Sequence, residues 1–595
     1  MSRKRSATHK SSVSQTERRN YGTPSPTVAT ASRVPGALDP PPVADAPWSI
    51  WSKSLVALLF VWVFLLGVTP LRDTDIWWHL RTGAYIWNEG IIPQTDLYTY
   101  TDWDQPWIDL HWGFQLLMLA VYSIAGVKGM VLFKAAALTS AVAIGWFAAG
   151  RTLSPVLRSL CWIAPIVCMS GRALERPEML SLIFLGYWLW VIPRLESRPN
   201  LIWTLPVVQL VWVNCHALFI LGLVVGGAYV VDRLLRWFFS ARRGLSQHVD
   251  QPPFIHLFRA GMLTLVACFV NPYFEEGAFF PAVLYRKFSV DQNIYGNTVG
   301  EFMPPLLFLK EGTSKYLYLD SLKYLYLDAE LLVFAVTFFS FLWLAYYRRW
   351  HPYRWLLFIA FSHLAWEASR NTNIFSLVSG VLLVANLEDI FRWHRSRAVT
   401  ASPQPWLGTR RLEKVGLAIV MGLIVSVLTG HWAAFGKEGK RLDWNEERAW
   451  FIHDAAKFAG RPGMPMTAYV SNFGQAAVYL YHNGPERRVF IDGRLEVARK
   501  ETYLLNDAIL EAMATINPHW EQALKDLSGD LPVVILDSRF SRAQINGMLN
   551  TPGWRLVFAD QSAAVFLTEA TANRLQLPEV DSTPLHDPPK IESPR

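Results

Sequence analysis

Twelve stretches of mostly apolar residues follow one another up to residue 431, and they constrain the fold more than any other feature of the sequence. A helix of about 20 apolar residues crosses the roughly 30 Å hydrocarbon core of a bilayer. Charged residues make up only 17% of the chain, too few for a soluble protein of this length, and its 27 Trp are of a type enriched at membrane–water interfaces. We therefore predict an α-helical polytopic membrane protein, with apolar segments at 54–71, 111–126, 129–149, 156–171, 178–195, 201–214, 217–238, 255–271, 329–347, 354–369, 371–388 and 412–431.

Clusters of Lys and Arg beside these segments predict the orientation of the chain, because cytoplasmic loops are enriched in positive charge. The basic N-terminal tail and the clusters at 233–243, 348–354 and 392–411 all fall on the cytoplasmic side, with pairs of spans between them. Segment 111–126 then has both ends outside. We predict about 11 spans, with 111–126 as an interfacial or re-entrant helix; 12 spans with a cytoplasmic C-terminus is the alternative. This topology accounts for the net charge of +8, so nucleic acid is not an expected partner.

The chain is expected to divide into four parts. These are a disordered basic cytoplasmic tail (1–47), a multi-spanning domain (48–432) with external loops at 72–110 and 272–328, a soluble extracytoplasmic α/β domain (440–570) and a disordered tail (571–595). In the α/β domain, β-rich runs alternate with helical patterns, which is typical of a small, largely parallel sheet and allows a final hairpin. The predicted strands are Thr467–Val470, Arg488–Ile491, Val533–Leu536, Arg555–Phe558 and Ala563–Leu567, and the predicted helices are 474–482, 499–513, 518–527 and 541–549.

Two carboxylates and a histidine, Asp73, Asp75 and His79, follow the first apolar segment in the motif Asp-Thr-Asp-Ile-Trp-Trp-His-Leu. On a helix, Asp75 and His79 share one face at a spacing of four residues. Partly apolar surroundings at a membrane surface raise the pKa of a carboxyl group, which suits a general base. The structural alternative is that the aspartates cap a juxtamembrane helix and the Trp pair anchors it. We assign all three residues a catalytic role, because a cap needs one Asp and not two with a His.

On the predicted topology, polar residues of three further connections reach the same outer face. An arginine fork matches phosphate geometry, and a phosphate at the bilayer surface is where a lipid-phosphate headgroup sits. For each residue alone, a snorkelling side chain, an ion pair with a neighbouring Glu or a packed histidine is the simpler interpretation. As a set they are candidates for substrate binding: Arg172, Arg176, Asn214, His216, Arg370 and Asn371.

A second candidate lies in the α/β domain, where a hydrophobic strand ends in Asp492-Gly493-Arg494. Ligands of parallel α/β sheets bind at the carboxyl ends of strands. The alternative is a tight turn, with Asp and Gly in their usual roles and a surface Arg. Both interpretations stay open, and we include Asp492 and Arg494 among the substrate-binding candidates.

The first-loop motif resembles that of multi-spanning bacterial membrane proteins related to the GT-C glycosyltransferases, which include dolichyl-phosphate-mannose protein mannosyltransferase-like and lipopolysaccharide-sugar transferase-like groups. The likeness covers about residues 70–500. The motifs that share it are Arg176-Pro-Glu178, Trp212-Val-Asn-Cys-His216, Asn271-Pro272, Ser369-Arg-Asn371 and Val489-Phe-Ile-Asp-Gly-Arg494.

This resemblance implies transfer of a sugar from a polyprenyl phosphate to an acceptor on the outer face of the cytoplasmic (inner) membrane. It implies that Asp73 or Asp75 acts on the acceptor or binds a metal, and that Arg172, Arg176 and Arg370 contact the phosphate. Many relatives carry Asp-Glu or a longer acidic motif, whereas this loop has Asp-x-Asp and then His. The identity of the base and the need for a divalent cation are therefore left open, and no metal ligand is assigned.

The sequence thus predicts an integral membrane glycosyltransferase-like protein whose partners are a polyprenyl-phosphate sugar, the lipid bilayer and an unidentified acceptor. Neither a GxxxxGK[ST] loop nor an HExxH motif occurs, which argues against an ATP-driven transporter and a zinc protease. Two other classes stay open. One is a transporter or flippase for a lipid-linked substrate, which would depend on charges within spans. The other is a non-catalytic scaffold that acts through the α/β domain.

Overall fold

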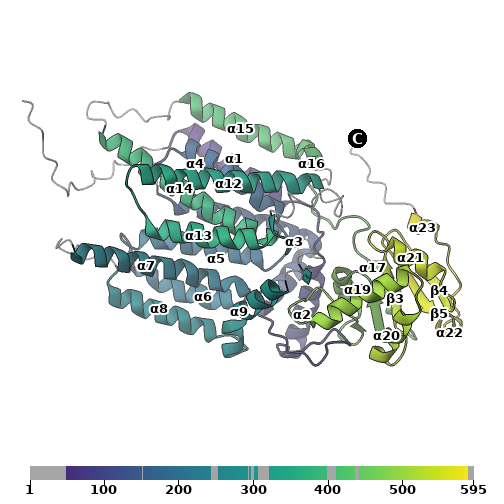
Figure 1. Ribbon diagram of the computed structural model, residues 1–595. Coiled ribbons are helices and arrows are strands. Elements are labelled where there is room, and N and C mark those ends of the chain that lie inside the picture. Colours follow the sequence, from purple (N-terminus) through teal and green to yellow (C-terminus); the bar gives the residue numbers. More distant parts are fainter. Residues whose placement is uncertain are drawn as a thin grey trace, which may run out of the picture. The chain divides into compact units, whose positions relative to one another are not determined.

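Helices make up most of the chain, and a small sheet lies at one end of them (Figure 1). The computed structural model describes residues 48–150, 152–242, 252–291, 294–295, 301–305, 320–397, 410–435 and 441–586. The predicted basic tail, residues 1–47, lies outside the described residues.

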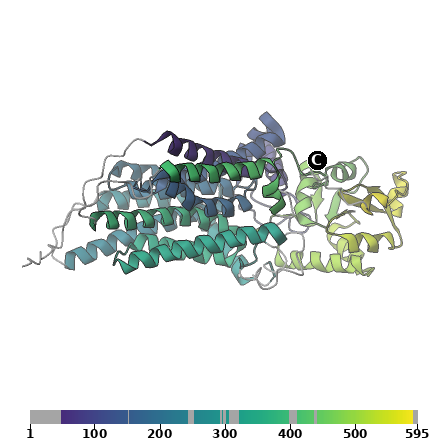
Figure 2. The ribbon, with the colours of Figure 1, turned by 90° about the horizontal axis from the view of Figure 1, so that it is seen from above.

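The helices of the N-terminal part pack side by side with their axes along a common direction (Figures 1 and 2). All twelve predicted apolar segments are helical over most of their length, and large side chains such as Trp62, Trp146 and Trp162 fill the core between them. The helices are α1 (Ile50–Gly67), α3 (Trp112–Ala148), α4 (Pro155–Gly171), α5 (Glu178–Val191), α6 (Thr204–Val213), α7 (Ile220–Arg242), α8 (Phe254–Phe269), α12 (Asp320–Tyr346), α13 (Pro352–Glu367), α14 (Thr372–Arg397) and α15 (Arg410–Leu428).

Five helices in the described part of the chain are long and apolar enough to cross a membrane. A sixth candidate is the pair α8 and α9 (Phe274–Val290), which a bend of 92° separates. Two further apolar helices, Pro155–Gly171 and Pro199–Val213, are shorter. A mostly helical protein with apolar helices and a small sheet is thus confirmed, while the helices of spanning length are fewer than the 11 predicted crossings. The five are Ile50–Gly67, Trp112–Ala148, Ala217–Phe239, Asp328–Tyr346 and Ser369–His394.

Segments 111–126 and 129–149, which we predicted as separate helices, are two helical stretches that meet at a kink at Gly126 and share the label α3. Gly126 has φ +60° and ψ −151°, a conformation that glycine adopts without the steric cost of a Cβ. The part before the break packs on α2 (Asp75–Glu89), where a Cβ on Gly83 would lie 2.7 Å from the carbonyl oxygen of Gln115. The boundary predicted between these two segments is therefore confirmed at Gly126.

The predicted external loop 272–328 is partly helical, because it contains α9 and the first residues of α12. Asn271 makes the turn before α9: its side chain donates to the carbonyl oxygens of Cys268 and Phe274 and accepts from the amide of Tyr273. Residues 292–293, 296–300 and 306–319 of this loop lie outside the described part.

The C-terminal part is an α/β structure around a five-stranded sheet of order β2-β1-β3-β5-β4. β1 pairs in parallel with β2 and β3, and β5 pairs antiparallel with β3 and β4, which confirms the parallel sheet with a final hairpin. The strands are β1 (Thr467–Val470), β2 (Arg488–Val489), β3 (Val533–Asp537), β4 (Trp554–Ala559) and β5 (Ala563–Thr568), and the main helices are α17 (His453–Ala459), α18 (Phe473–Asn483), α19 (Lys500–Ala514), α20 (His519–Ser528) and α21 (Arg542–Leu549).

Two details of this part differ from expectation. β2 ends at Val489 and not at Ile491, because the chain turns there into the Asp492-Gly493-Arg494 segment. The predicted disordered tail from 571 is ordered up to residue 586: α22 (Glu569–Arg574) is capped by Thr568, and α23 (Thr583–His586) follows.

The first loop holds the sheet against the helices. Thr99 forms a parallel bridge with Val489, and the backbone of Tyr98 and Tyr100 bonds to the same residue. A second contact joins Arg72 to the start of the C-terminal part, through an ion pair with Glu447 (3.0 Å) and a hydrogen bond from the Trp450 indole to the Arg72 carbonyl. The carboxyl ends of the parallel strands are thereby fixed close to the Asp73-Thr74-Asp75 segment.

Candidate functional site

Asp73 and Asp75 stand at the entrance to α2 and play different parts. The side chain of Asp73 is almost completely buried, and its Oδ1 accepts the backbone N–H of Asp75. Asp73 therefore accepts the first backbone N–H of α2 in addition to its charge contacts, while Thr74 occupies the N-cap position without a side-chain cap hydrogen bond. The Asp75 side chain retains 21% of its exposed surface, so it is the one of the two that a substrate can reach.

Arg176, in the connection between α4 and α5, binds both aspartates. Its Nε and Nη2 contact the two oxygens of Asp73 at 2.8 and 3.0 Å, and Nη2 lies 2.9 Å from Asp75 Oδ2. Its Nη1 donates to Glu301 at 2.8 Å. A guanidinium with three carboxylate partners is pre-oriented, and all of them favour its charged form.

Glu301 contacts both Arg176 and a second arginine, Arg172. Arg172 Nη2 lies 3.1 Å from Glu301, and Arg172 Nε lies 3.2 Å from Glu178 at the start of α5. Burial opposes the ionisation of Glu301, but Arg172 and Arg176 outweigh it and hold its pKa well below the ordinary value. Sequence reasoning missed Glu301, because it lies in a polar loop more than a hundred residues from its partners.

Arg370 completes the cluster from the start of the α14 segment. Its guanidinium lies over the rings of Phe302 and Phe288, with 4.3 and 5.5 Å to the ring centroids, and its backbone N–H bonds to the Glu301 carbonyl. Within the part of the chain that the structure describes, its guanidinium has no carboxylate partner. It is the arginine of the three that is free to bind an anion.

The pKa of Asp75 is raised from its ordinary value of 3.8 to about 7. Burial is the largest cause; Arg176 opposes it, and the carboxylates of Asp73, Glu301 and Glu496 add to it. Asp75 thus adds a carboxyl group to a region that already holds those of Asp73, Glu301 and Glu496. A group with a pKa near 7 exchanges a proton readily at neutral pH, which is what a general base requires.

The Asp492-Gly493-Arg494 turn closes over Asp75 from the sheet side. A Cβ on Gly493 would lie 2.7 Å from Asp75 Oδ1, so only glycine allows this approach. Arg494 is completely buried, and its Nη2 contacts Asp96 Oδ1 at 2.5 Å and Asp492 Oδ2 at 2.6 Å. The Arg494 guanidinium also lies 4.3 Å from the centroid of the Trp107 ring. Both charged side chains of the turn are thus occupied within the protein.

Three histidines lie next to the carboxylates. The rings of His79 and His216 are 5.6 and 5.5 Å from that of His111, centroid to centroid. Burial, together with the charge on His111, lowers the pKa of His79 and His216 well below the ordinary value, so both are neutral at pH 7. Burial also disfavours the cation of His111, but Asp109, 3.3 Å from its Nδ1, reverses the effect and raises its pKa. His79 is 3% exposed and therefore unsuited to direct proton transfer with a substrate.

The side chains of Asn214 and Asn371 form hydrogen bonds to backbone carbonyl groups. The Asn214 side chain accepts from the Trp112 indole and donates to the Leu210 and Val270 carbonyls, which joins α3, α6 and α8. The Asn371 side chain donates to the Leu364 carbonyl near the end of α13. His216 Nδ1 and Ser181 Oγ form a hydrogen bond of 2.8 Å. The structure therefore brings Asp73, Asp75, Arg172, Arg176 and Arg370 into one cluster. Asn214, Asn371 and His216 lie around this cluster and bind other parts of the protein.

In the described ranges, no group of three or more His, Cys, Asp or Glu side chains is arranged to hold a metal ion. Comparison with protein-family models and with curated proteins found no match to this chain. The function therefore rests on the geometry of the cluster.

Proposed function

We propose that this protein is a GT-C-like glycosyltransferase of the cytoplasmic membrane, which moves a sugar from a polyprenyl phosphate to an acceptor on the outer face. In this proposal about 11 segments cross the bilayer, the N-terminus is cytoplasmic, and the α/β domain stands outside, above the acidic cluster.

The charge at the two ends of the helices supports this placement. α4, α5 and α14 each have one end at the cluster, and their opposite ends carry basic residues. There, Arg158 pairs with Glu388 at 3.1 Å, and Arg354, which belongs to one of the clusters used to orient the chain, pairs with Asp389 at 2.8 Å. The cluster then lies on the side opposite the positive charge, as expected for an outer-face site.

In the proposed reaction, Asp75 takes the proton of an acceptor hydroxyl as its oxygen bonds to the anomeric carbon of the sugar. The bond between that carbon and the phosphate oxygen breaks, and the lipid phosphate leaves with the electron pair. Arg370 stabilises the departing charge, since no described carboxylate forms a direct ion pair with its guanidinium. Asp73 and Arg176 hold Asp75 in place, and Asp492 and Arg494 position the turn that encloses it.

The single observation that carries the proposal is the state of Asp75. It is reachable from solvent, has a pKa of about 7 and lies in a cluster that also holds Arg370, an arginine without a direct ion pair to a described carboxylate. A purely structural carboxylate gains from a low pKa and full pairing, as Glu301 does. A raised pKa costs stability and is typical of a functional group.

The test is turnover by purified protein with a panel of synthetic polyprenyl-phosphate hexoses and pentoses, read as released polyprenyl phosphate. Because Asp75 must be ionised to accept a proton, we expect the rate to rise with pH and level off above about 7. Asp75→Asn should lower the rate by about 100-fold or more, which is the usual contribution of a general base.

The matched control is Asp104→Asn, which removes another aspartate of the same loop that pairs with Arg499 away from the cluster. It should keep the wild-type rate and pH profile. If Asp75→Asn turns over as fast as the wild type, Asp75 is not the base. If the wild type and all variants move a labelled polyprenyl-phosphate sugar across vesicle membranes without releasing polyprenyl phosphate, the protein is a transporter and the transferase proposal fails.

A further inference from the structure

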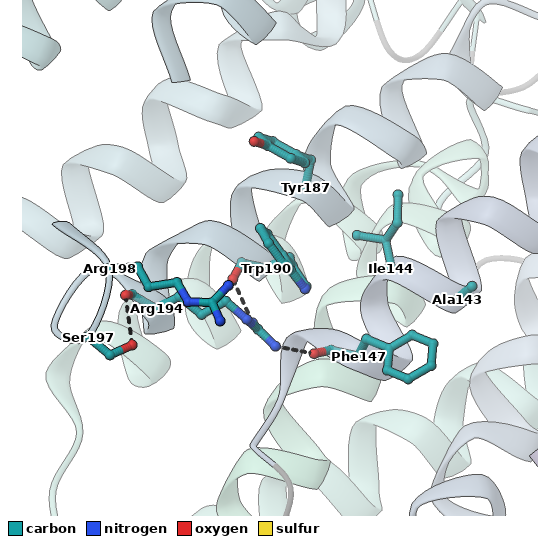
Figure 3. Close-up of a pocket in the computed structure, with 8 residues that line it drawn as sticks. All are labelled: Ala143, Ile144, Phe147, Tyr187, Trp190, Arg194, Ser197 and Arg198. Carbon is teal, nitrogen blue, oxygen red and sulfur yellow. Dashed lines mark hydrogen bonds between the residues drawn. The ribbon is translucent and has the colours of Figure 1, made fainter. Parts of the chain in front are cut away.

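A pocket of about 560 Å³ opens between the C-terminal halves of α3 and α5, far along these helices from the acidic cluster (Figure 3). Ala143, Ile144 and Phe147 of α3 and Trp190 of α5 form an apolar wall. Phe147 is 39% exposed, so this wall is open to the surroundings.

The far edge of the pocket is polar and basic. Arg194, Ser197 and Arg198 come from the connection after α5 (Figure 3). The Arg194 guanidinium donates to the carbonyl oxygens of Phe147, Ala148 and Trp190 and lies 4.5 Å from the Trp190 ring centroid. Arg194 thus terminates two helices, fixes the aromatic wall and brings a positive charge to the edge of the pocket.

Arg198 is the arginine of the pocket whose guanidinium is available to a ligand. It is exposed, and within the described ranges its guanidinium has neither a hydrogen bond nor an ion pair. Two arginines that meet at one edge repel each other, and an anion between or beside them removes that cost. The pocket therefore combines an apolar wall with a basic edge at which Arg198 is available to a ligand, which is the complement of an anionic amphiphile.

The position of the pocket along the helices, relative to the two surfaces of the bilayer, determines what kind of amphiphile fits. From Glu178, which pairs with Arg172 of the acidic cluster at the start of α5, to Arg194 at the basic edge, a rise of 1.5 Å per residue gives about 24 Å, most of the thickness of a bilayer core of about 30 Å. The basic edge then lies at the opposite interface from Asp75, where Trp190 and Tyr187 have the position of interfacial aromatic residues. A lipid of the cytoplasmic leaflet has its phosphate at this level and its acyl chains along the apolar wall.

We propose that this pocket is a binding site for an anionic phospholipid, whose phosphate contacts Arg198 and Arg194 and whose acyl chain lies along α3 and α5. The inference shares only the membrane placement with the proposed function. It does not depend on glycosyl transfer, because the site is at the other end of the helices.

The experiment is native mass spectrometry of the purified full chain with dioleoyl phosphatidylglycerol or dioleoyl phosphatidylcholine. We expect the anionic lipid to be retained by the wild type and bound about tenfold or more weakly by Arg198→Ala, the loss expected for one charge-assisted contact. Arg349→Ala is the matched control, since it removes another exposed arginine that lies outside the pocket. Ala143→Trp should also abolish binding by filling the apolar wall while leaving both arginines.

Equal retention of the two lipids, or unchanged phosphatidylglycerol binding in Arg198→Ala, would overturn the inference. An equal loss in Arg349→Ala would overturn it too, because binding would then follow net charge and not this pocket. A polyprenyl phosphate that displaces phosphatidylglycerol at equal concentration would replace the phospholipid as the occupant. Melting temperatures of all variants show that the readout concerns folded protein; Arg198, which has no described partner, can be changed without loss of a contact.

Discussion

Asp75→Asn should make the protein more stable at alkaline pH, and the size of the effect follows from the pKa of Asp75. In an unfolded chain its pKa is near 3.8, and in the folded protein it is about 7. Between these values the folded state binds the proton more tightly than the unfolded state, so folding stability falls as pH rises through this window. Below pH 4 the carboxyl is protonated in both states and no cost remains.

The full cost above pH 7 is about 4 kcal/mol, from 1.36 kcal/mol for each tenfold change in the ionisation equilibrium, and it is an upper bound because the side chain keeps 21% of its exposure. The Asn variant lacks the ionisation. It should therefore gain stability over the wild type as pH rises from 4 to 8, by up to that amount.

The assay is thermal unfolding of the purified protein in detergent, followed by tryptophan fluorescence at a series of pH values. The informative quantity is the difference between variant and wild type at each pH, since titration of His111 and other groups cancels in it. Asp104→Asn should show no such gain. If the difference for Asp75→Asn is the same at pH 4.5 and pH 8, the pKa of Asp75 is not raised, and its assignment as a base is refuted.

Two other substitutions test how the sheet is fixed over the cluster. Arg494→Ala should lower the free energy of unfolding by about 3–5 kcal/mol, because it leaves Asp96 and Asp492 buried without their cation. Chemical unfolding measures this loss, and a loss below about 1 kcal/mol would contradict the buried ion pairs. Gly493→Ala should reduce turnover while the fold is kept, because the new Cβ would lie 2.7 Å from Asp75 Oδ1. Unchanged kinetics would mean that the turn does not enclose Asp75. Gly422→Ala controls for general effects of an added methyl group, because its new Cβ would have no neighbouring atom within 4 Å.

The elements of the α/β part could be predicted closely, since strands and helices there alternate with clear changes of period. Val533–Leu536 is a fully buried apolar run between polar segments, and Asn472 caps α18 by accepting from the amide of Gly474. The break within α3 lies at the predicted boundary between segments 111–126 and 129–149, but its geometry could not be predicted, because a glycine in an apolar run is compatible with a helix end, a kink or a turn. Which of these occurs depends on the packing of α2 against the first half of α3.

The sequence also indicated that Asp73, Asp75 and Arg176 lie near one another, but not which contacts each of them makes. Asp73, Asp75 and Arg176 could be grouped, because orientation puts their connections on one face. The burial of Arg494 could not be foreseen, since its partner Asp96 is 398 residues away in the chain. Glu301 was missed for the same reason. Local patterns show where charge occurs, whereas pairing depends on which loops meet.

An electron-microscopy map of the protein with added polyprenyl phosphate would decide whether the acidic cluster is the donor site. We predict phosphate density beside the Arg370 guanidinium, within the cluster that contains Asp75, and loss of that density in Arg370→Gln. Density confined to the Arg198 pocket, or density at the cluster that persists in Arg370→Gln, would contradict the proposed site.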